Sequence, residues 1–278
     1  MLYRGMDRAQ LDAAYNNSAA VPERDAILAG WAARSARVRR ETAGHLDLAY
    51  GDTPRERLDL FLAADPDAPT LAFIHGGYWQ INDIVKESFA FFAEGLLPLG
   101  INLAVIEYTL APAARLDRIV AEVRRSVRWL AEHRAEYGAD PTRLYISGHS
   151  AGGHLTAMTM PLPEVRSARR DRDQWHLRDG ADPAQLPQRE AGSRYGRGGT
   201  QQPDPAFAGD GRGAGGGLRH SGIARIAPPV DRVCRAWTER GLPGRLLPVH
   251  GADHFTILDA LARPEGVLTQ ALLAMLGR

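Results

Sequence analysis

The stretch RLYISGHSAGGHL at residues 143–155 decides the fold of this chain. It opens with Arg143–Ile146, whose apolar residues are typical of a strand buried in a parallel sheet. It runs into Ala151–Met160, a compact apolar segment that predicts a helix. Glycines at 148 and 152 permit a tight turn between the two. A strand that turns sharply and enters a helix indicates an α/β architecture.

The same alternation extends toward the N-terminus. Short apolar runs at Leu71–Ile74 and Leu103–Ile106 predict two more buried parallel strands. Phe89–Leu97 predicts a helix between them, and Leu116–Glu136 predicts an amphipathic helix after them. Strands that alternate with helices predict an α/β fold with a mostly parallel central sheet and helices on both faces.

The ends of the chain add further elements to this single predicted domain of 1–278. In chain order they are helices over 7–40 with an N-cap at Asp7 and a break at Val21-Pro22, a half-exposed hairpin of His45–Tyr50 and Arg57–Ala63, a strand over Arg245–His250 and a helix over Phe255–Leu276. No internal repeat is visible.

Composition and charge exclude several classes of protein. The chain has 278 residues with 34 basic and 33 acidic side chains, and its formal net charge is +1. This balance argues against a dedicated nucleic-acid or membrane-surface binder. The one cysteine, Cys234, cannot form an internal disulfide, and Met1–Ala20 lacks the apolar run of a signal peptide or membrane span. We therefore expect a cytoplasmic location.

Ser150 is the candidate nucleophile. It is the central residue of Gly148-His149-Ser150-Ala151-Gly152, a G-x-S-x-G pattern that follows a predicted strand and opens a predicted helix. In that context the serine hydroxyl is lifted to the carboxyl edge of the sheet, and the N–H of Ala151 faces the oxyanion it would form. The alternative is a structural turn of the same composition.

A second motif, His75-Gly76-Gly77-Tyr78-Trp79, follows the first buried strand. Two glycines at a strand end let the N–H groups of Gly76, Gly77 or Tyr78 approach a substrate and stabilise an oxyanion. Tyr78 and Trp79 are suited to stack on an aromatic substrate, although aromatic residues there serve packing equally well. The alternative is a β-turn anchored by the aromatic pair.

His254, in Gly251-Ala252-Asp253-His254-Phe255, is the candidate general base. It lies after the last predicted strand and follows Ser150 in the chain, as a serine hydrolase requires. The alternative is a solvated loop histidine. The acid that would orient this histidine is left unassigned, because Asp231 follows no predicted strand, Asp253 adjoins the histidine and points elsewhere, and Asp210 lies in a glycine run.

The other histidines give no metal site. His75, His149, His154 and His250 include no pair at metal-ligand spacing with a carboxylate partner on one helix. We expect them to line the pocket, His149 above all, or to cap strands.

Together these motifs resemble the hormone-sensitive-lipase side of the α/β hydrolases, and within it the kynurenine formamidase (arylformamidase) and carboxylesterase group. The resemblance covers roughly 2–163 and 237–276 and rests on YRGMD at 3–7 with Leu11 and Tyr15, HGGYW at 75–79, EYTLAP at 107–112, GHSAGGHL at 148–155 and GADHF at 251–255. It implies an acyl transfer to water through Ser150 and His254, without metal or cofactor, on N-formylkynurenine or small acyl esters.

The chain departs from this family in its centre. The family has two further strands between the elbow helix and the last strand, and the second delivers the acid of the triad. Residues 171–220 contain no Ile or Val, 12 of the 50 are apolar, and 11 of the chain's 29 glycines lie there. Such a segment buries too little surface to offset its ordering entropy, so we expect it to be disrupted or disordered.

A shifted reading frame would explain this composition. Permitted codons for residues 210–222, read one base later, give TAAVPVVAYGTPE, an apolar strand that ends in a carboxylate. The same shift gives family-like peptides for 172–190 and 218–235. We hypothesise that about 170–235 is translated out of frame; the alternative is a disordered or lid-like insertion.

Three functional readings follow. The first is a serine hydrolase that cleaves a carboxylic ester or an aryl formamide, whose partner is a small acyl substrate. The second is an inactive relic of such an enzyme, damaged by the shifted frame. The third is a binding protein that uses the same pocket without chemistry. The sequence does not distinguish ester from formamide substrates or reveal the oligomeric state.

Overall fold

The computed structural model describes residues 7–10, 16, 18–160, 239 and 247–278 of this chain. The suspect segment 171–235, with its proposed frame shift and the candidate acids Asp210 and Asp231, lies outside these residues. The prediction of one domain over 1–278 therefore stays a prediction.

The described strands form one mixed sheet in the order β1-β2-β4-β3-β5. Their bounds are β1 Gly44–Ala49, β2 Arg57–Phe61, β3 Thr70–Ile74, β4 Asn102–Ile106 and β5 Leu144–Gly148. β3 pairs in parallel with both β4 and β5, while β2 is antiparallel to β1 and β4. The three predicted parallel strands and the predicted hairpin are confirmed, and their parallel register brings the ends of β3 and β5 to the same edge.

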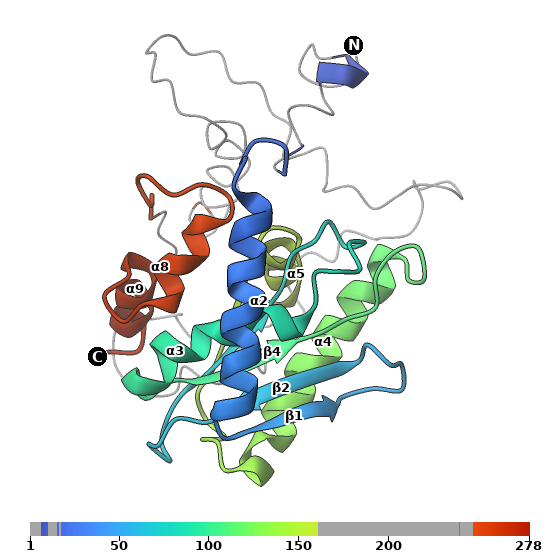
Figure 1. Ribbon diagram of the computed structural model, residues 1–278. Coiled ribbons are helices and arrows are strands. Elements are labelled where there is room, and N and C mark those ends of the chain that lie inside the picture. The colour runs from blue at the N-terminus through green and yellow to red at the C-terminus, as the bar shows by residue number, and fades with distance from the viewer. Residues whose placement is uncertain (1–6, 11–15, 17, 161–238, 240–246) are drawn as a thin grey trace.

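One face of the sheet is covered by α2 (Arg24–Glu41), by the segment formed by η1 (Lys86–Phe92), α3 (Ala93–Leu96) and η2 (Leu97–Leu99), and by the C-terminal helices. α2 crosses the front of the sheet in Figure 1. Its Trp31 is buried and stacks on Phe91, with ring centroids 5.5 Å apart. Alternate strand residues such as Phe73 and Val105 complete this core.

The opposite face is covered by α4 (Leu116–His133), continued by η3 (Arg134–Tyr137), and by α5 (Ala151–Thr159). α4 lies behind the sheet in Figure 1. Its apolar stripe, which includes Val123 and Val127, packs on the strand residues that point away from α2, such as Ile74 and Ile106. Both faces are apolar because a sheet with helices on each side must bury both sets of alternating side chains.

Three details differ from the predictions. β2 is largely buried rather than half-exposed, because it pairs with β4 inside the sheet. A strand was predicted over 245–250, but its described residues, 247–250, are not in a strand. No described strand lies beyond β5 to pair with them. The predicted helix 255–276 is divided into η7 (Thr256–Leu258), α8 (Asp259–Ala262) and α9 (Val267–Met275), because Pro264 and Gly266 interrupt it.

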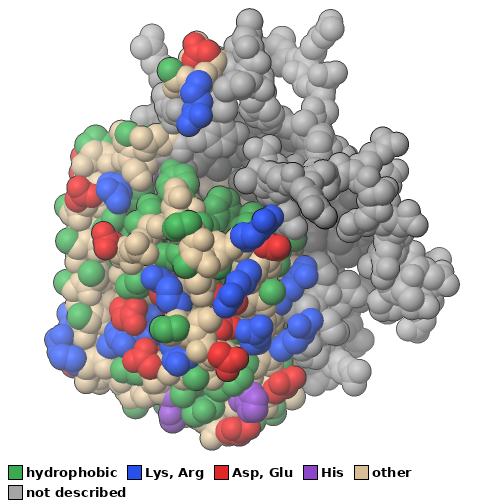
Figure 2. Space-filling model, turned by 90° about the vertical axis from the view of Figure 1, so that its right-hand side faces the viewer, with side chains coloured by type: hydrophobic (Ala, Val, Ile, Leu, Met, Phe, Trp, Pro, Cys, Tyr) green, Lys and Arg blue, Asp and Glu red, His purple; other side chains and the backbone are tan. Residues whose placement is uncertain are grey.

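Basic and acidic side chains alternate over the face shown in Figure 2, so neither sign dominates it. At the N-terminus, Asp7 and Gln10 exchange hydrogen bonds between side chain and backbone at 2.8 and 3.0 Å, which confirms the predicted cap at Asp7. Among the helices that the structure describes, none combines the length and the apolar character needed to cross a membrane.

Candidate active site

Ser150 occupies a sharp turn between β5 and α5. Its φ of 56° and ψ of −119° place it in a region that few residues other than glycine adopt. The close packing around the turn explains its glycines: a Cβ on Gly152 would lie 2.0 Å from the carbonyl oxygen of Ile74, and a Cβ on Gly148 would lie 2.3 Å from that of Gly152. The turn therefore requires glycine on both sides and holds Ser150 at the end of the sheet.

The loop after β3 lies directly against this turn. A Cβ on Gly76 would lie 2.9 Å from the carbonyl oxygen of His149 and 3.0 Å from the Cβ of Ser150, so the two segments touch through backbone. Gly77 has a φ of 101°. The N–H groups of Gly76, Gly77 and Ala151 donate to no acceptor within the described residues. Unused donors beside a serine hydroxyl are what oxyanion binding requires.

The two aromatic side chains of this loop lie in different environments. Tyr78 and Trp79 both have positive φ, 51° and 59°, and their side chains go to different places. Tyr78 lines the pocket at Ser150. Trp79 does not; it packs on the second core and meets His154 edge to face, with centroids 5.4 Å apart. The structure thus places Trp79 in the packing role that the sequence left open for it, outside the pocket predicted to contain it.

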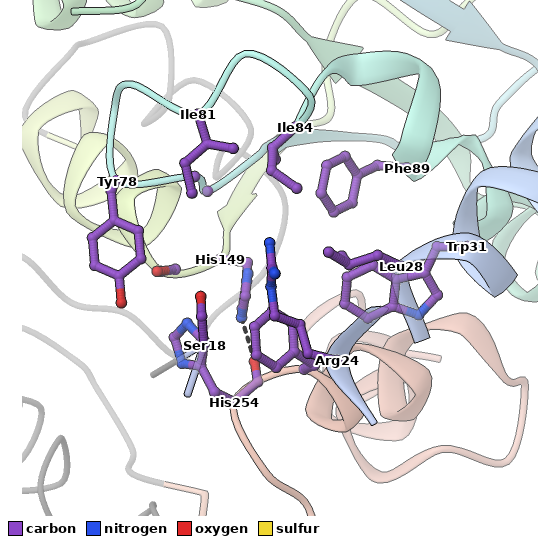
Figure 3. Close-up of a pocket in the computed structure, with 14 residues that line it drawn as sticks. Ser18, Arg24, Leu28, Trp31, Tyr78, Ile81, Ile84, Phe89, His149 and His254 are labelled. Atoms are coloured by element: carbon purple, nitrogen blue, oxygen red, sulfur yellow. Dashed lines mark hydrogen bonds between the residues drawn. The ribbon is translucent and has the colours of Figure 1, made fainter. Parts of the chain in front are cut away.

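One pocket brings together the other candidates. It is lined by Ser150, His149 and His254, and by Gly76, Gly77 and Tyr78. Ala151 lies buried just behind, at the start of α5. Figure 3 shows Tyr78, His149 and His254 around the cavity, with Leu28 and Trp31 of α2 on the far wall.

His254 shares this pocket with Ser150 without a direct hydrogen bond between them. Burial lowers the pKa of the His254 imidazole from its ordinary value, and the neighbouring carboxylate of Asp253 raises it in part. A lowered pKa keeps the imidazole neutral at pH 7, which is the form that accepts a proton. A loose contact between nucleophile and base is common in structures without substrate.

His149 contacts the His254 segment. Its Nε2 lies 2.6 Å from the carbonyl oxygen of His254, and the two ring centroids are 4.7 Å apart. Burial, reinforced by the charge of His254 and opposed by this hydrogen bond, lowers the pKa of His149 to about 3. His149 is therefore neutral, and because a carbonyl only accepts, its Nε2 carries the proton.

Asp253 is engaged elsewhere, as the sequence predicted. Its Oδ1 accepts hydrogen bonds from the N–H groups of Phe255 and Thr256 at 2.7 and 2.8 Å, and its own N–H donates to the Thr256 hydroxyl. Asp253 thus caps the turn that opens η7. No carboxylate in the described part of the chain hydrogen-bonds to the His254 ring, so the acid stays unassigned.

Glu107 contacts the base of the 75–79 loop, the loop predicted to bind an oxyanion, and was not singled out by the sequence as a functional residue. Its carboxylate bonds to His75 Nε2 at 3.0 Å, to Arg55, and to the N–H groups of Lys86 and Tyr108. Burial raises its pKa, but the charges and hydrogen bonds of His75, Arg55 and Lys86 outweigh that effect and hold the pKa at about 2. The carboxylate is therefore ionised and fixes His75 at the base of the loop.

Two polar residues of the pocket were also missed, Ser18 and Arg24. Figure 3 shows Arg24 extending from the start of α2 into the cavity beside His149. No local motif marks these residues, because only the packing of α2 on the sheet brings them to the site. Over the described ranges, no group of three or more His, Cys, Asp or Glu side chains is placed to hold a metal ion.

The sequence is similar to those of several known proteins. Residues 58–174 match the BD-FAE family. Kynurenine formamidase from Danio rerio is 36% identical over 126 residues, which cover 45% of this chain and 41% of that protein. Esterase LipQ from Mycobacterium tuberculosis is 34% identical over 125 residues, covering 43% of this chain and 30% of that protein. The chain thus spans well under half the length of these curated relatives.

A solved structure is similar to this chain in fold. A candidate thioesterase from Silicibacter sp. TM1040 superposes with a TM-score of 0.63 at 22% identity, covering 94% of this chain and 98% of that one. The resemblance to the kynurenine formamidase and carboxylesterase group is confirmed by these alignments. The chain therefore has the α/β-hydrolase fold, and its residues 58–174 match the BD-FAE family.

Proposed function

We propose that this protein is a serine hydrolase that cleaves carboxylic esters or aryl formamides. Ser150 would be the nucleophile and His254 the general base, while the N–H groups of Gly76, Gly77, Tyr78 and Ala151 would bind the oxyanion. The observation that carries the proposal is the strained turn at Ser150, which lies beside the N–H groups of Gly76, Gly77 and Ala151, donors without a described acceptor, while His254 lines the same pocket as Ser150. Strain of this kind is costly to keep and is concentrated at functional sites.

The chemistry follows from the positions of these groups. Ser150 Oγ attacks the substrate carbonyl carbon while His254 takes the hydroxyl proton, and the resulting oxyanion is bound by the backbone donors. The C–O or C–N bond to the leaving group then breaks, and the leaving group receives the proton from His254. Water, deprotonated by His254, attacks the acyl-serine and releases the acid and the free Ser150.

The walls of the pocket support an aromatic or apolar substrate. Trp31, Phe89 and Tyr78 supply aromatic surface, and Leu28, Ile81 and Ile84 supply aliphatic surface. An aryl ring seated there would gain stacking contacts beyond simple burial. Relatives named kynurenine formamidase and esterase support a formamide or an ester as the substrate class.

Labelling with a fluorophosphonate probe tests the nucleophile directly. We expect the full chain to be labelled at Ser150 and to hydrolyse 4-nitrophenyl acetate, and both reactions to disappear in Ser150→Ala. Ser147→Ala, three residues earlier on β5 and outside the pocket lining, is the matched control and should retain both. Labelling that persists in Ser150→Ala would remove Ser150 from the mechanism.

The same experiment separates the other two readings. A binding protein without chemistry would retain an aromatic ligand in Ser150→Ala yet never be labelled in the parent chain. An inactive relic would show neither property. Sequencing the gene across codons 165–240 decides whether the central segment is read in frame, and a one-base-shifted variant that gains activity would support the relic.

A further inference from the structure

Among the described residues, one hydrogen bond joins the segment that carries His254 to the turn at Ser150. Within the described residues, the hydrogen bonds of residues 249–257 join members of this segment to each other, as in the Asp253 cap, or to the next residue, Leu258. The exception among the described residues is the bond from His149 Nε2 to the carbonyl oxygen of His254, at 2.6 Å and across 105 positions of sequence.

His149 stands where three parts of the site meet. Its backbone belongs to the Ser150 turn, and its N–H donates to the carbonyl oxygen of Ile74 at 3.2 Å. Its ring lies beside the oxyanion loop, since a Cβ on Gly76 would be 3.4 Å from its Nδ1. From that position the ring reaches the backbone of His254 and lines the pocket beside it (Figure 3).

The need for such a tie follows from the fold. In a sheet, strand pairing fixes the loop that follows a strand, but residues 247–250 are not in a strand of the described sheet. Phe255 supplies an apolar anchor by packing near Trp31, with ring centroids 6.3 Å apart. An apolar contact is non-directional, whereas a short hydrogen bond fixes both position and orientation.

We propose that His149 is a positioning residue that holds His254 at the correct distance from Ser150 by donating a hydrogen bond from its imidazole to the His254 carbonyl. The role rests on the proposed hydrolase function. It does not require His149 to touch the substrate or exchange a proton. It requires a neutral donor at the position of Nε2.

Two substitutions separate this role from simple packing. Gln places an amide nitrogen as many bonds from Cα as the imidazole Nε2, so His149→Gln keeps the donor; His149→Leu fills similar space without one. We expect His149→Leu to lower the fluorophosphonate labelling rate of Ser150 and kcat by about tenfold to a hundredfold with little change in KM, the cost of a base displaced by about 1 Å. His149→Gln should remain within about threefold of the parent.

His250→Gln is the matched control, because it removes an exposed imidazole from the same segment. It should leave labelling and turnover unchanged. Equal losses in His149→Gln and His149→Leu, with unchanged thermal stability, would overturn the proposal, as would a His149→Leu variant with the parent rate.

Amide hydrogen exchange of the peptide 249–257 supplies a readout that needs no activity. If His149 holds this segment, exchange should be at least about threefold faster in His149→Leu than in the parent chain and near parental in His149→Gln. Unchanged exchange in His149→Leu refutes the positioning role. If exchange is faster in His149→Leu as expected but the parent chain is not labelled by the fluorophosphonate, the hydrolase function alone is refuted. The two failures are therefore distinguishable.

Discussion

Glu107 and His75 form a buried pair, with Oε1 of the carboxylate 3.0 Å from Nε2 of the imidazole, at the base of the loop that carries Gly76 and Gly77. The imidazole is enclosed by Tyr108, whose ring stacks on it with centroids 4.4 Å apart and whose hydroxyl donates to the carbonyl oxygens of His75 and Gly76. The 75–79 loop is therefore held in place by the carboxylate of Glu107, a residue from another part of the chain.

Glu107→Gln should destabilise the protein and impair turnover. The substitution keeps the shape but removes the charge that faces Arg55 and His75, and breaking a buried pair costs about 3–5 kcal/mol. Urea unfolding measures the loss, and Glu132→Gln, exposed on α4, is the control that should change stability by less than about 0.5 kcal/mol. A Glu107→Gln protein of parental stability would show that the ionised carboxylate is not needed.

Gly152→Ala and Gly153→Ala should differ sharply although the residues are adjacent on α5. A Cβ at 152 would lie 2.0 Å from the carbonyl oxygen of Ile74, whereas a Cβ at 153 meets nothing closer than 3.4 Å. We expect Gly152→Ala to cost about 3 kcal/mol or more, because backbone must move. Gly153→Ala should be neutral or stabilising by up to about 1 kcal/mol, as for alanine in a helix. Thermal unfolding of the pair tests this contrast, and similar values would contradict it.

The pH dependence of kcat/KM should reflect the lowered pKa of His254. A base works when it is unprotonated, so activity rises with pH through its pKa, and burial places that rise below the ordinary histidine value of 6.5. In Asp253→Asn the nearby negative charge is lost while an oxygen remains to accept from Phe255 and Thr256, so the rise should move to still lower pH. A rise above 6.5, or a shift upward in the variant, would exclude His254 as the base.

Arg24 should favour substrates that carry a carboxylate. It is the one cation that lines the pocket among the described residues, no described acidic residue lines it, and its partner Asp25 lies outside, at 2.9 Å. Arg24→Gln should lower kcat/KM for the mono-4-nitrophenyl ester of glutaric acid by about tenfold, as expected for a lost charge-assisted hydrogen bond.

The same variant should leave 4-nitrophenyl butyrate nearly unaffected, since that ester is neutral. Arg37→Gln, on an exposed part of α2, controls for the change in net charge. Equal effects of Arg24→Gln on both esters would show that Arg24 acts on the pocket shape and not on substrate charge.

Much of the fold was determined by the sequence itself. The apolar runs that became β3, β4 and β5 are short and continuous, which is typical of strands covered on both faces. The Ser150 turn was equally evident, because Gly148 and Gly152 are needed for local steric reasons that operate within a few residues. Patterns that depend on neighbours in sequence are readable without a structure.

Features that depend on contacts between residues far apart in the sequence were visible only in the tertiary structure. Whether 247–250 is a strand depends on a neighbouring strand to pair with. Tyr78 and Trp79 have similar positive φ values, yet in the folded chain the first lines the pocket and the second packs against a core.

The site shows the same division. Ser150 and His254, the proposed nucleophile and base, were singled out from local motifs, because each lies in a short pattern that can be recognised within a few residues. Glu107 beneath the oxyanion loop, Arg24 in the pocket and the bond between His149 and the His254 carbonyl join residues 105 positions apart or on separate elements. No local pattern encodes such contacts. The register of β3 beside β4 places Glu107 next to His75, and the packing of α2 and of the C-terminal helices on one face of the sheet sets the other two positions.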